Sequence, residues 1–258
     1  MHPEIQIGPL TLQTFGLMFA LAFLAAGALI WKRFEEIGKP PDWAYEMGFS
    51  ALVGGVIGSR VYFIVDNYSD VKDDLLGNIF SGSGLTWYGG AIGGAIAVFL
   101  WAWYRGFLGL ALLDVAAPAL ALGYAIGRCG CQLSGDGDYG KAWDGPWAMA
   151  YPDGTVPTDQ TVHPTPIYET LAMGLVTYVL WRLRAAFRPG LLFALYLVLA
   201  GSERFLVEFI RRNEDAALGL TEAQLISVAM IIVGGVWLAS GRLKSSAGAR
   251  RRLESTSR

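Results

Sequence analysis

The sequence predicts an all-α integral membrane protein with about seven transmembrane helices, because it is strongly apolar and its apolar residues fall in long stretches. Of the 258 residues, 53% are hydrophobic and 16% are charged, and the mean hydropathy is +0.41. A helix crosses the bilayer core with about 20 apolar residues. Stretches of about this length span residues 10–31, 42–66, 84–104, 107–127, 167–185, 190–210 and 221–240.

The first stretch sets the predicted orientation in the membrane. It is preceded by MHPEIQIG, which carries no Lys or Arg, and it is followed by Lys32, Arg33 and Lys39. A signal peptide has the opposite polarity, so this order indicates an uncleaved helix with its N-terminus outside. With seven spans, most of the 20 Lys and Arg residues then lie on the inner side, as the positive-inside rule requires.

The second and third stretches contain the glycine-rich segments GGVIG (54–58) and GGAIGG (89–94). Small residues at these spacings let two helix backbones approach closely in lipid, so we expect them to mediate helix packing and assign them no chemistry. Each stretch also carries one polar residue near its outer end, Arg60 in the second and Tyr88 in the third.

The fourth stretch runs into GRCGCQLSGDGDYG (127–140), which is too polar for lipid. We expect Arg128 to end the helix at the outer interface, where its charge complements the helix dipole. The glycines that follow allow a tight return of the backbone toward a ligand. Asp136 and Asp138 either order this loop through Asx turns or contact a second substrate. Cys129 and Cys131 fit best as small interfacial fillers, and a metal site would need further ligands.

The segment that follows, about 141–166, is rich in Trp, Pro, Gly and Asp, and predicts a small extracytoplasmic cap. His163 and Pro164 then shape the entry into the fifth stretch. At the start of that stretch, Tyr168 and Glu169 are expected to form hydrogen bonds within the bundle. The sixth stretch contains Arg204 and, one turn later, Glu208.

We therefore predict a single transmembrane domain over residues 1–240, with the periplasmic loop and cap 128–166 inserted, and a flexible, basic cytoplasmic tail over 241–258. A net charge of −2 and scattered basic residues argue against a nucleic-acid partner. No metal and no cofactor is predicted.

Five polar residues from four stretches share one predicted depth, near the outer headgroups. At about 1.5 Å per residue, Arg60 and Arg204 each lie about 9 Å below the outer ends of their helices. Asp114 alone falls in the inner half. Ionisable groups in a membrane are costly and usually functional. The five residues are Arg60, Tyr88, Arg128, Arg204 and Glu208.

This layer predicts a binding site for a phosphate. Three arginines against one glutamate leave a positive surplus, and guanidinium groups bind phosphate through paired hydrogen bonds. The nearest phosphate is a phospholipid headgroup. The alternative is structural, with Arg60 reaching the interface alone and Arg204 pairing with Glu208 at i,i+4.

Several segments of the sequence resemble those of a known family. The segments DVAAPALALGYAIGRCGCQLSGDGDYG (114–140), HPTPIYE (163–169) and ERFLVEFIRR (203–212) resemble the bacterial prolipoprotein diacylglyceryl transferases. FGLMFALAF (15–23), GSRVYF (58–63) and YGG (88–90) extend the similarity over nearly the whole chain.

The resemblance implies an enzyme of the bacterial inner membrane with its active site toward the periplasm. Such an enzyme moves the diacylglyceryl group of phosphatidylglycerol to the thiol of a lipobox cysteine in a prolipoprotein. A thioether forms and glycerol 1-phosphate leaves. By position, the resemblance implies five site residues: the essential arginines Arg128 and Arg204, the acids Asp136 and Glu208, and the glycine Gly140. The predicted polar layer adds two more site residues, Arg60 and Tyr88.

Several positions depart from the family pattern: Tyr88 replaces a His, Phe15 and Ala200 replace Tyr, and Cys131 and Ser134 replace Asn. Two alternatives therefore stay open, a paralogue with a different acceptor and a non-catalytic seven-helix lipid-binding or transport protein. The chemistry tolerates loss of the His, since a thiol with a pKa of about 8.5 is already partly ionised at neutral pH. Tyr88 is then expected to orient the phosphate or the acceptor, with Asp136, Asp138 or Glu208 as base for a hydroxyl or amine acceptor.

Overall fold

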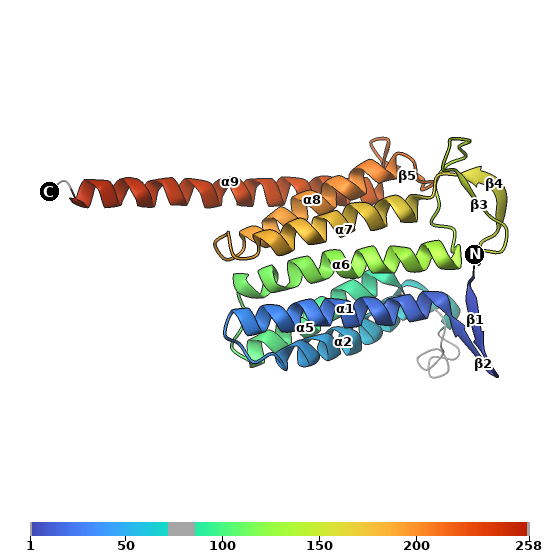
Figure 1. Ribbon diagram of the computed structural model, residues 1–258, viewed down its shortest axis with the longest axis horizontal. Helices are drawn as coiled ribbons and strands as arrows, with labels where there is room; N and C mark the ends of the chain where they lie inside the picture. Colours follow the sequence, from blue (N-terminus) through green and yellow to red (C-terminus); the bar gives the residue numbers. More distant parts are fainter. Residues whose placement is uncertain (1, 72–85, 257–258) are drawn as a thin grey trace. The chain divides into compact units, whose positions relative to one another are not determined.

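The computed structural model describes residues 2–71 and 86–256, with side chains described as far as Gly241. Among these residues, seven helices have 18 residues or more (Figure 1). Residues 84 and 85 of the predicted third span lie outside the described residues, and so do the side chains of most of the predicted tail. The long helices are α1 (Thr14–Glu36), α2 (Trp43–Asp66), α5 (Trp87–Tyr104), α6 (Leu110–Ser134), α7 (Thr165–Leu183), α8 (Leu191–Glu208) and α9 (Glu222–Thr256).

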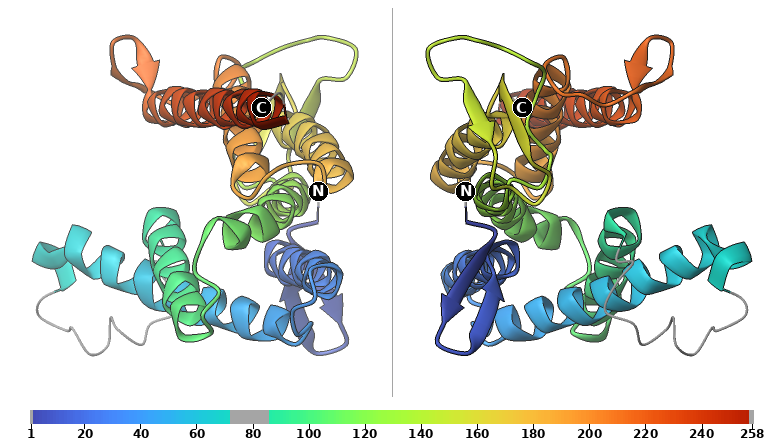
Figure 2. Two further views of the ribbon diagram at one scale, coloured as in Figure 1. Left: turned by 90° about the vertical axis from the view of Figure 1, so that its left-hand side faces the viewer. Right: turned by 90° about the vertical axis from the view of Figure 1, so that its right-hand side faces the viewer.

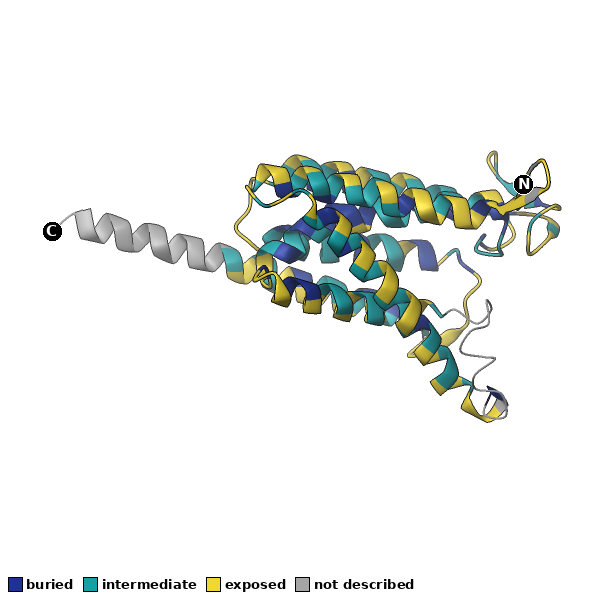
Figure 3. Cartoon of the chain, turned by 90° about the horizontal axis from the view of Figure 1, so that it is seen from below, coloured by how far each residue is buried: buried dark blue, intermediate teal, exposed yellow. Residues whose placement is uncertain are grey.

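The helices have the character of a membrane protein. Within the described part of the chain, four segments are long and apolar enough to cross a membrane: α1, α2, α6 and the part of α9 from Glu222 to Gly241. Exposed residues, yellow in Figure 3, run along the helices, and many of them are large and apolar. In water such surfaces would drive association, whereas in lipid they face the acyl chains. The all-helical membrane class is confirmed, while seven spans and their topology stay a prediction.

Short β-hairpins join or precede some helices. They are β1 (Glu4–Ile7) with β2 (Leu10–Gln13), β3 (Met149–Tyr151) with β4 (Thr158–Val162), and β5 (Asp215–Ala217) with β6 (Leu220–Thr221), all antiparallel. The prediction that the first helix begins at residue 10 was wrong. Residues 10–13 alternate apolar and polar side chains and pair with β1 across a turn that contains Gly8 at φ +62°.

The chain forms two compact units, one from Met1–Leu29 with Leu113–Arg258 and the other from Ile30–Leu112. In the second unit, α2 and α5 pack through glycine. A Cβ atom on Gly58 would lie 2.4 Å from the carbonyl oxygen of Gly89, so only glycine fits there. Ser59 and Thr86 donate hydroxyl hydrogen bonds to each other's carbonyl oxygens, at 2.8 and 3.1 Å. The predicted helix-packing role of the glycine-rich segments is confirmed.

In the first unit, α7, α8 and α9 run side by side (Figures 1 and 2). Small residues of α6, such as Ala117 and Ala121, pack with Met173 and Leu180 of α7. Asp114, near the start of α6, accepts hydrogen bonds from the backbone N–H groups of Gly190 (2.7 Å) and Phe193 (2.9 Å). This acid therefore caps the N-terminus of α8 and has a structural role.

Candidate active site

Arg128 lies within α6 and does not end it. The prediction that the helix stops at this residue was wrong, because α6 continues to Ser134. The guanidinium is only 15% exposed and its Nε atom lies 2.9 Å from Glu169 Oε2, while Nη2 donates to the Tyr124 hydroxyl at 3.1 Å. Because the charge is compensated inside the bundle, the helix need not end at this residue. The chain turns away only at Gly135 and Gly137, which adopt positive φ angles.

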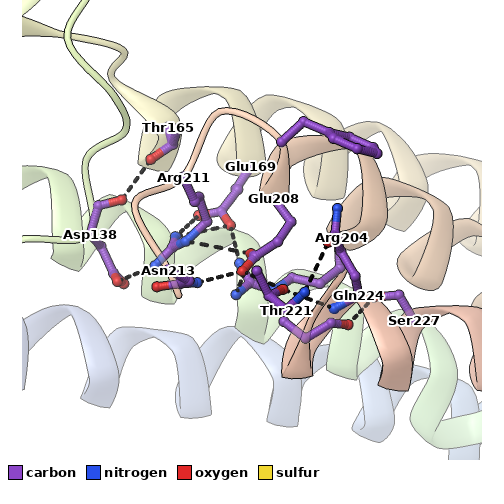
Figure 4. A network of polar contacts seen from close by, with 12 residues as sticks. Asp138, Thr165, Glu169, Arg204, Glu208, Arg211, Asn213, Thr221, Gln224 and Ser227 are labelled. Carbon is purple, nitrogen blue, oxygen red and sulfur yellow. Dashed lines mark hydrogen bonds and ion pairs between the residues drawn. The ribbon is translucent and has the colours of Figure 1, made fainter. Parts of the chain in front are cut away.

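Glu169, near the start of α7, is the centre of the site. Its side chain is completely buried, and three guanidinium groups from different segments converge on its carboxylate. Besides Arg128, Arg204 of α8 donates from Nη1 to Oε1 at 3.1 Å. Arg211, just beyond α8, places Nη1 3.4 Å from both oxygens (Figure 4). A buried carboxylate shared in this way fixes the direction of each guanidinium.

Glu208, the last residue of α8, anchors the other side of Arg204. Its Oε2 lies 2.9 Å from Arg204 Nη2, so the i,i+4 pair of the structural alternative is present. Its Oε1 accepts hydrogen bonds from Asn213 Nδ2 at 2.6 Å and from the Thr221 hydroxyl at 2.8 Å. Oε2 is buried yet receives no hydrogen bond of good geometry from the described residues. Its contacts with Arg204 and, at 3.8 Å, with Arg211 Nε are therefore ion pairs without a well-aligned hydrogen bond.

Asp138 closes the site from the loop after α6. One carboxylate oxygen pairs with Arg128 Nη1 and the other with Arg211 Nη2. Burial alone would raise the pKa of Asp138, but the charges of Arg128 and Arg211 outweigh that effect and hold the pKa below its ordinary value. The backbone N–H of Asp138 donates to Asp136 Oδ1 at 3.3 Å, as the predicted Asx turn requires.

The described cluster is charge-balanced. Sequence reasoning predicted a positive surplus of three arginines over one glutamate. In the structure Arg128, Arg204 and Arg211 face three carboxylates, so that surplus is absent from this cluster of described residues. The difference arises because α7 and the loop after α6 each bring one further acid, Glu169 and Asp138, into contact with the arginines.

Arg60 and Tyr88 belong to the other compact unit. The Arg60 guanidinium lies 5.9 Å from the ring centre of Phe63, and Tyr88 is 38% exposed with its ring 5.3 Å from that of Trp87. Their predicted place in one layer with the arginines of the first unit stays a prediction.

Gly140 occupies a position where only glycine fits. A Cβ atom there would lie 2.5 Å from the carbonyl oxygen of Ile210, and the Gly140 N–H donates to the carbonyl of His163 at 2.8 Å. The glycine thus joins the loop after α6 to the segments that precede α7 and follow α8. Its proposed contact with substrate, like that of Asp136, stays a prediction.

Sequence reasoning missed Arg211 and gave Glu169 only a structural role. A signal for Arg211 was present, since Arg204, Glu208 and Arg211 follow each other at i, i+4 and i+7, the spacing of one helix face. The central position of Glu169 depends on how α6, α7 and α8 pack, which local spacing does not encode.

Cys131, Asp136 and Asp138 bring three potential metal-ligand atoms within 4.8 Å of one another. The same place is occupied by a cation from the protein itself. Arg128 Nη1 pairs with Asp138 and lies 3.8 Å from Cys131 Sγ. A metal ion would meet this positive charge at close range, so we assign the group to the arginine cluster.

The segment between α6 and α7, which was predicted to form a cap, is held in place by aromatic stacking. Tyr139 stacks on Tyr151 of β3 at 4.7 Å between ring centres, and Trp143 stacks on His163 at 4.4 Å. Burial raises the pKa of Tyr151 to about 12. Trp147 donates from Nε1 to the Tyr168 hydroxyl at 2.7 Å. The Tyr168 contact joins the cap to the start of α7 beside Glu169. Thr165, four residues before Glu169, adds a second link by donating its hydroxyl to the Asp138 carbonyl.

The fold and the site together define an all-helical membrane protein with a buried cluster of arginines and carboxylates, a feature that is usually functional in a membrane. The chain belongs to the prolipoprotein diacylglyceryl transferase family, whose model matches residues 4–240.

Several proteins named phosphatidylglycerol–prolipoprotein diacylglyceryl transferase are similar to this chain over most of its length. The protein from Clostridium tetani is 33% identical over 85% of this chain and 89% of its own. That from Chromohalobacter salexigens is 34% identical, over 89% of this chain and 88% of its own. The protein from Vibrio parahaemolyticus is 32% identical over 89% of this chain and 86% of its own.

Proposed function

We propose that this protein is a phosphatidylglycerol–prolipoprotein diacylglyceryl transferase. The observation that carries the proposal is the convergence of Arg128, Arg204 and Arg211 around Glu169, in a chain that matches the family model almost from end to end. The relatives' names supply the two substrates, phosphatidylglycerol and a prolipoprotein.

The reaction is a displacement at the glyceryl carbon that carries the phosphate. The sulfur of the acceptor cysteine attacks this carbon, a carbon–sulfur bond forms, and the carbon–oxygen bond to phosphorus breaks. The electron pair of that bond leaves with the phosphate oxygen as glycerol 1-phosphate, and the thiol proton passes to a base or to solvent. Negative charge therefore grows on the phosphate during the reaction.

Arg128 and Arg204 are proposed to stabilise this negative charge. Guanidinium groups directed at the phosphate oxygens stabilise the departing monoester more than the bound diester, which is the requirement for catalysis. Glu169 holds both side chains in fixed directions, at 2.9 and 3.1 Å, so little reorganisation is needed during the reaction. Gly140 and Arg60 are proposed to contribute to phospholipid binding.

Glu208 is proposed to receive the proton of the acceptor. Its Oε2 atom is buried, receives no hydrogen bond from the described residues and lies 2.9 Å from Arg204 Nη2. For a thiol, strong base assistance is not required, because a few per cent is thiolate at neutral pH and nearby cations increase that fraction. Asp136 and Tyr88 are proposed to orient the acceptor.

We place the site at the periplasmic face of a bacterial inner membrane, with the N-terminus periplasmic, seven spans and a cytoplasmic basic tail. Two observations support this placement. The positively charged residues favour the opposite side of the membrane. The cluster also lies where α6 and α8 end and α7 begins, the same end of the first unit that carries its β-hairpins (Figure 1).

Purified protein in detergent with phosphatidylglycerol and a synthetic lipobox peptide tests the proposal. We expect glycerol 1-phosphate release and a peptide mass increased by one diacylglyceryl group, in equal amounts. A peptide with the lipobox Cys replaced by Ser is the control and should not react. A paralogue with another acceptor would instead leave the Cys peptide unmodified while complementation of a transferase-depleted strain fails.

A further inference from the structure

We propose that Arg128 and Arg211 form an anion subsite that the Asp138 carboxylate occupies, and that the phosphate of the phospholipid displaces this carboxylate on binding. The inference rests on the proposed function and adds a residue that competes with the substrate. It also assigns Arg211 to the phosphate-binding group.

The geometry of Asp138 resembles that of a bound phosphate. Its two oxygens are divided between two guanidinium groups, Oδ2 with Arg128 and Oδ1 with Arg211. The two arginines are only 15% and 7% exposed. A phosphodiester also presents two charged oxygens to such a pair and also carries one negative charge. Exchange of one anion for the other leaves the charge balance of the cluster unchanged.

Of the three carboxylates in this cluster, that of Asp138 is the one able to move away from its arginine partners. The side chains of Glu169 and Glu208 are completely buried, whereas that of Asp138 is 33% exposed. Glu169 contacts three arginines, and Glu208 is held in addition by Asn213 and Thr221. Moving either of them would strand a buried charge.

The backbone at Asp138 is held independently of its carboxylate. The Thr165 hydroxyl donates to the Asp138 carbonyl at 2.6 Å, and the Asp138 N–H donates to Asp136. The side chain is therefore free to rotate toward the headgroup region while the loop keeps its place. In the empty protein the carboxylate keeps the two guanidinium groups directed at one point, so the subsite is already formed when the lipid arrives.

Competition by Asp138 also has a consequence for the product. Glycerol 1-phosphate is a monoester with a charge of about −1.5 to −2 at neutral pH, so it binds arginines more strongly than the diester does. A tethered carboxylate that returns to the same guanidinium groups opposes the rebinding of product. Asp138 thus weakens the binding of both phosphates.

The test is Asp138→Asn, which keeps the shape and removes the charge. We expect the KM for phosphatidylglycerol and the inhibition constant for glycerol 1-phosphate each to fall about three- to tenfold, the effect of losing an ion pair of about 1 kcal/mol. The lipid-free protein should melt at a lower temperature, and added glycerol 1-phosphate should raise its Tm more than that of the wild type. Asp138→Glu, which keeps the charge, should restore values near those of the wild type.

Asp159→Asn is the matched control, because it removes an exposed carboxylate from β4, outside the cluster, and should change none of these values. A lower Tm with both constants unchanged or raised would show that Asp138 has only a structural role, and would overturn the inference. If Asp138→Asn does not fold, Asp138→Ser is measured in the same way. A wild-type protein without transferase activity would contradict the proposed function, whereas glycerol 1-phosphate binding and its effect on Tm still report on the subsite.

Discussion

The carboxylate of Glu169 on α7 lies 2.9 Å from the Nε atom of Arg128 on α6, and no part of its side chain is exposed. The two residues are far apart in the sequence, and their pairing fixes the direction of an arginine that we propose to bind the departing phosphate. Glu169 also contacts Arg204 and Arg211, so this single acid orients the guanidinium groups of three arginines.

Arg128→Ala and Arg204→Ala are each expected to lower turnover at least 10²- to 10³-fold, because each removes a positive charge directed at the departing phosphate. Glycerol 1-phosphate release and peptide lipidation measure the effect. Cys129→Ala is the control on α6 and should keep most of the activity, since its Sγ atom lies 3.6 Å from the Thr170 hydroxyl and contacts none of the charged groups of the cluster among the described residues. Full activity in either arginine variant would remove the phosphate-binding role of that residue.

Glu169→Gln should destabilise the protein and lower its activity together. Loss of one partner from a buried ionic cluster leaves the arginines without compensation and costs about 3–5 kcal/mol. Thermal unfolding in detergent, followed by circular dichroism, measures the change. Glu214→Gln, at an exposed position after α8, is the control and should leave the Tm unaltered. An unchanged Tm in Glu169→Gln would mean that the carboxylate is not the centre of the cluster.

Thr221 is expected to position Glu208. Its hydroxyl donates to Glu208 Oε1 at 2.8 Å and accepts from the backbone N–H of Gln224 at 3.2 Å, so it both caps α9 and holds the acid (Figure 4). Thr221→Val keeps the shape but loses both bonds, and should cost about 1–3 kcal/mol of stability and reduce kcat. Thr221→Ser should restore both quantities. A valine variant with the kcat of the wild type would exclude the positioning role.

Stability should depend on pH through Asp138. Because the folded-state pKa of this acid lies below its ordinary value, its ion pairs stabilise the protein fully at pH values above the unfolded-state pKa of about 3.9. That contribution is lost as pH falls through the folded-state pKa. Tm profiles over the acidic range should therefore be flatter for Asp138→Asn than for the wild type. Parallel profiles would contradict the pairing of Asp138 with Arg128 and Arg211.

Tyr88 stands where the family pattern has a histidine. If this position faces the site, Tyr88→His should retain or raise the rate of peptide lipidation. Tyr88→Phe, which removes only the hydroxyl, should slow the reaction by weakening the orientation of phosphate or acceptor. Collapse of activity in a folded Tyr88→His variant would show that this chain uses the position differently from its relatives.

Hydropathy located the helices well, because the length of a span is set by the bilayer and not by tertiary contacts. The i,i+4 pair of Arg204 and Glu208 was likewise predictable, since both residues lie on one helix. The meeting of Arg128, Glu169 and Arg211 was not, because it depends on how α6, α7 and the segment after α8 pack. The extension of α6 beyond Arg128 was missed for the same reason, as an arginine that looks exposed in the sequence is neutralised by distant acids.

The most direct test of the central claim is an experimental structure of the protein in lipid nanodiscs that contain phosphatidylglycerol. The account predicts a headgroup phosphate within hydrogen-bonding distance of the guanidinium groups of Arg128, Arg204 and Arg211, with the Asp138 carboxylate turned away from both Arg128 and Arg211. A headgroup bound elsewhere, with all three arginines still paired to Asp138, Glu169 and Glu208, would contradict it.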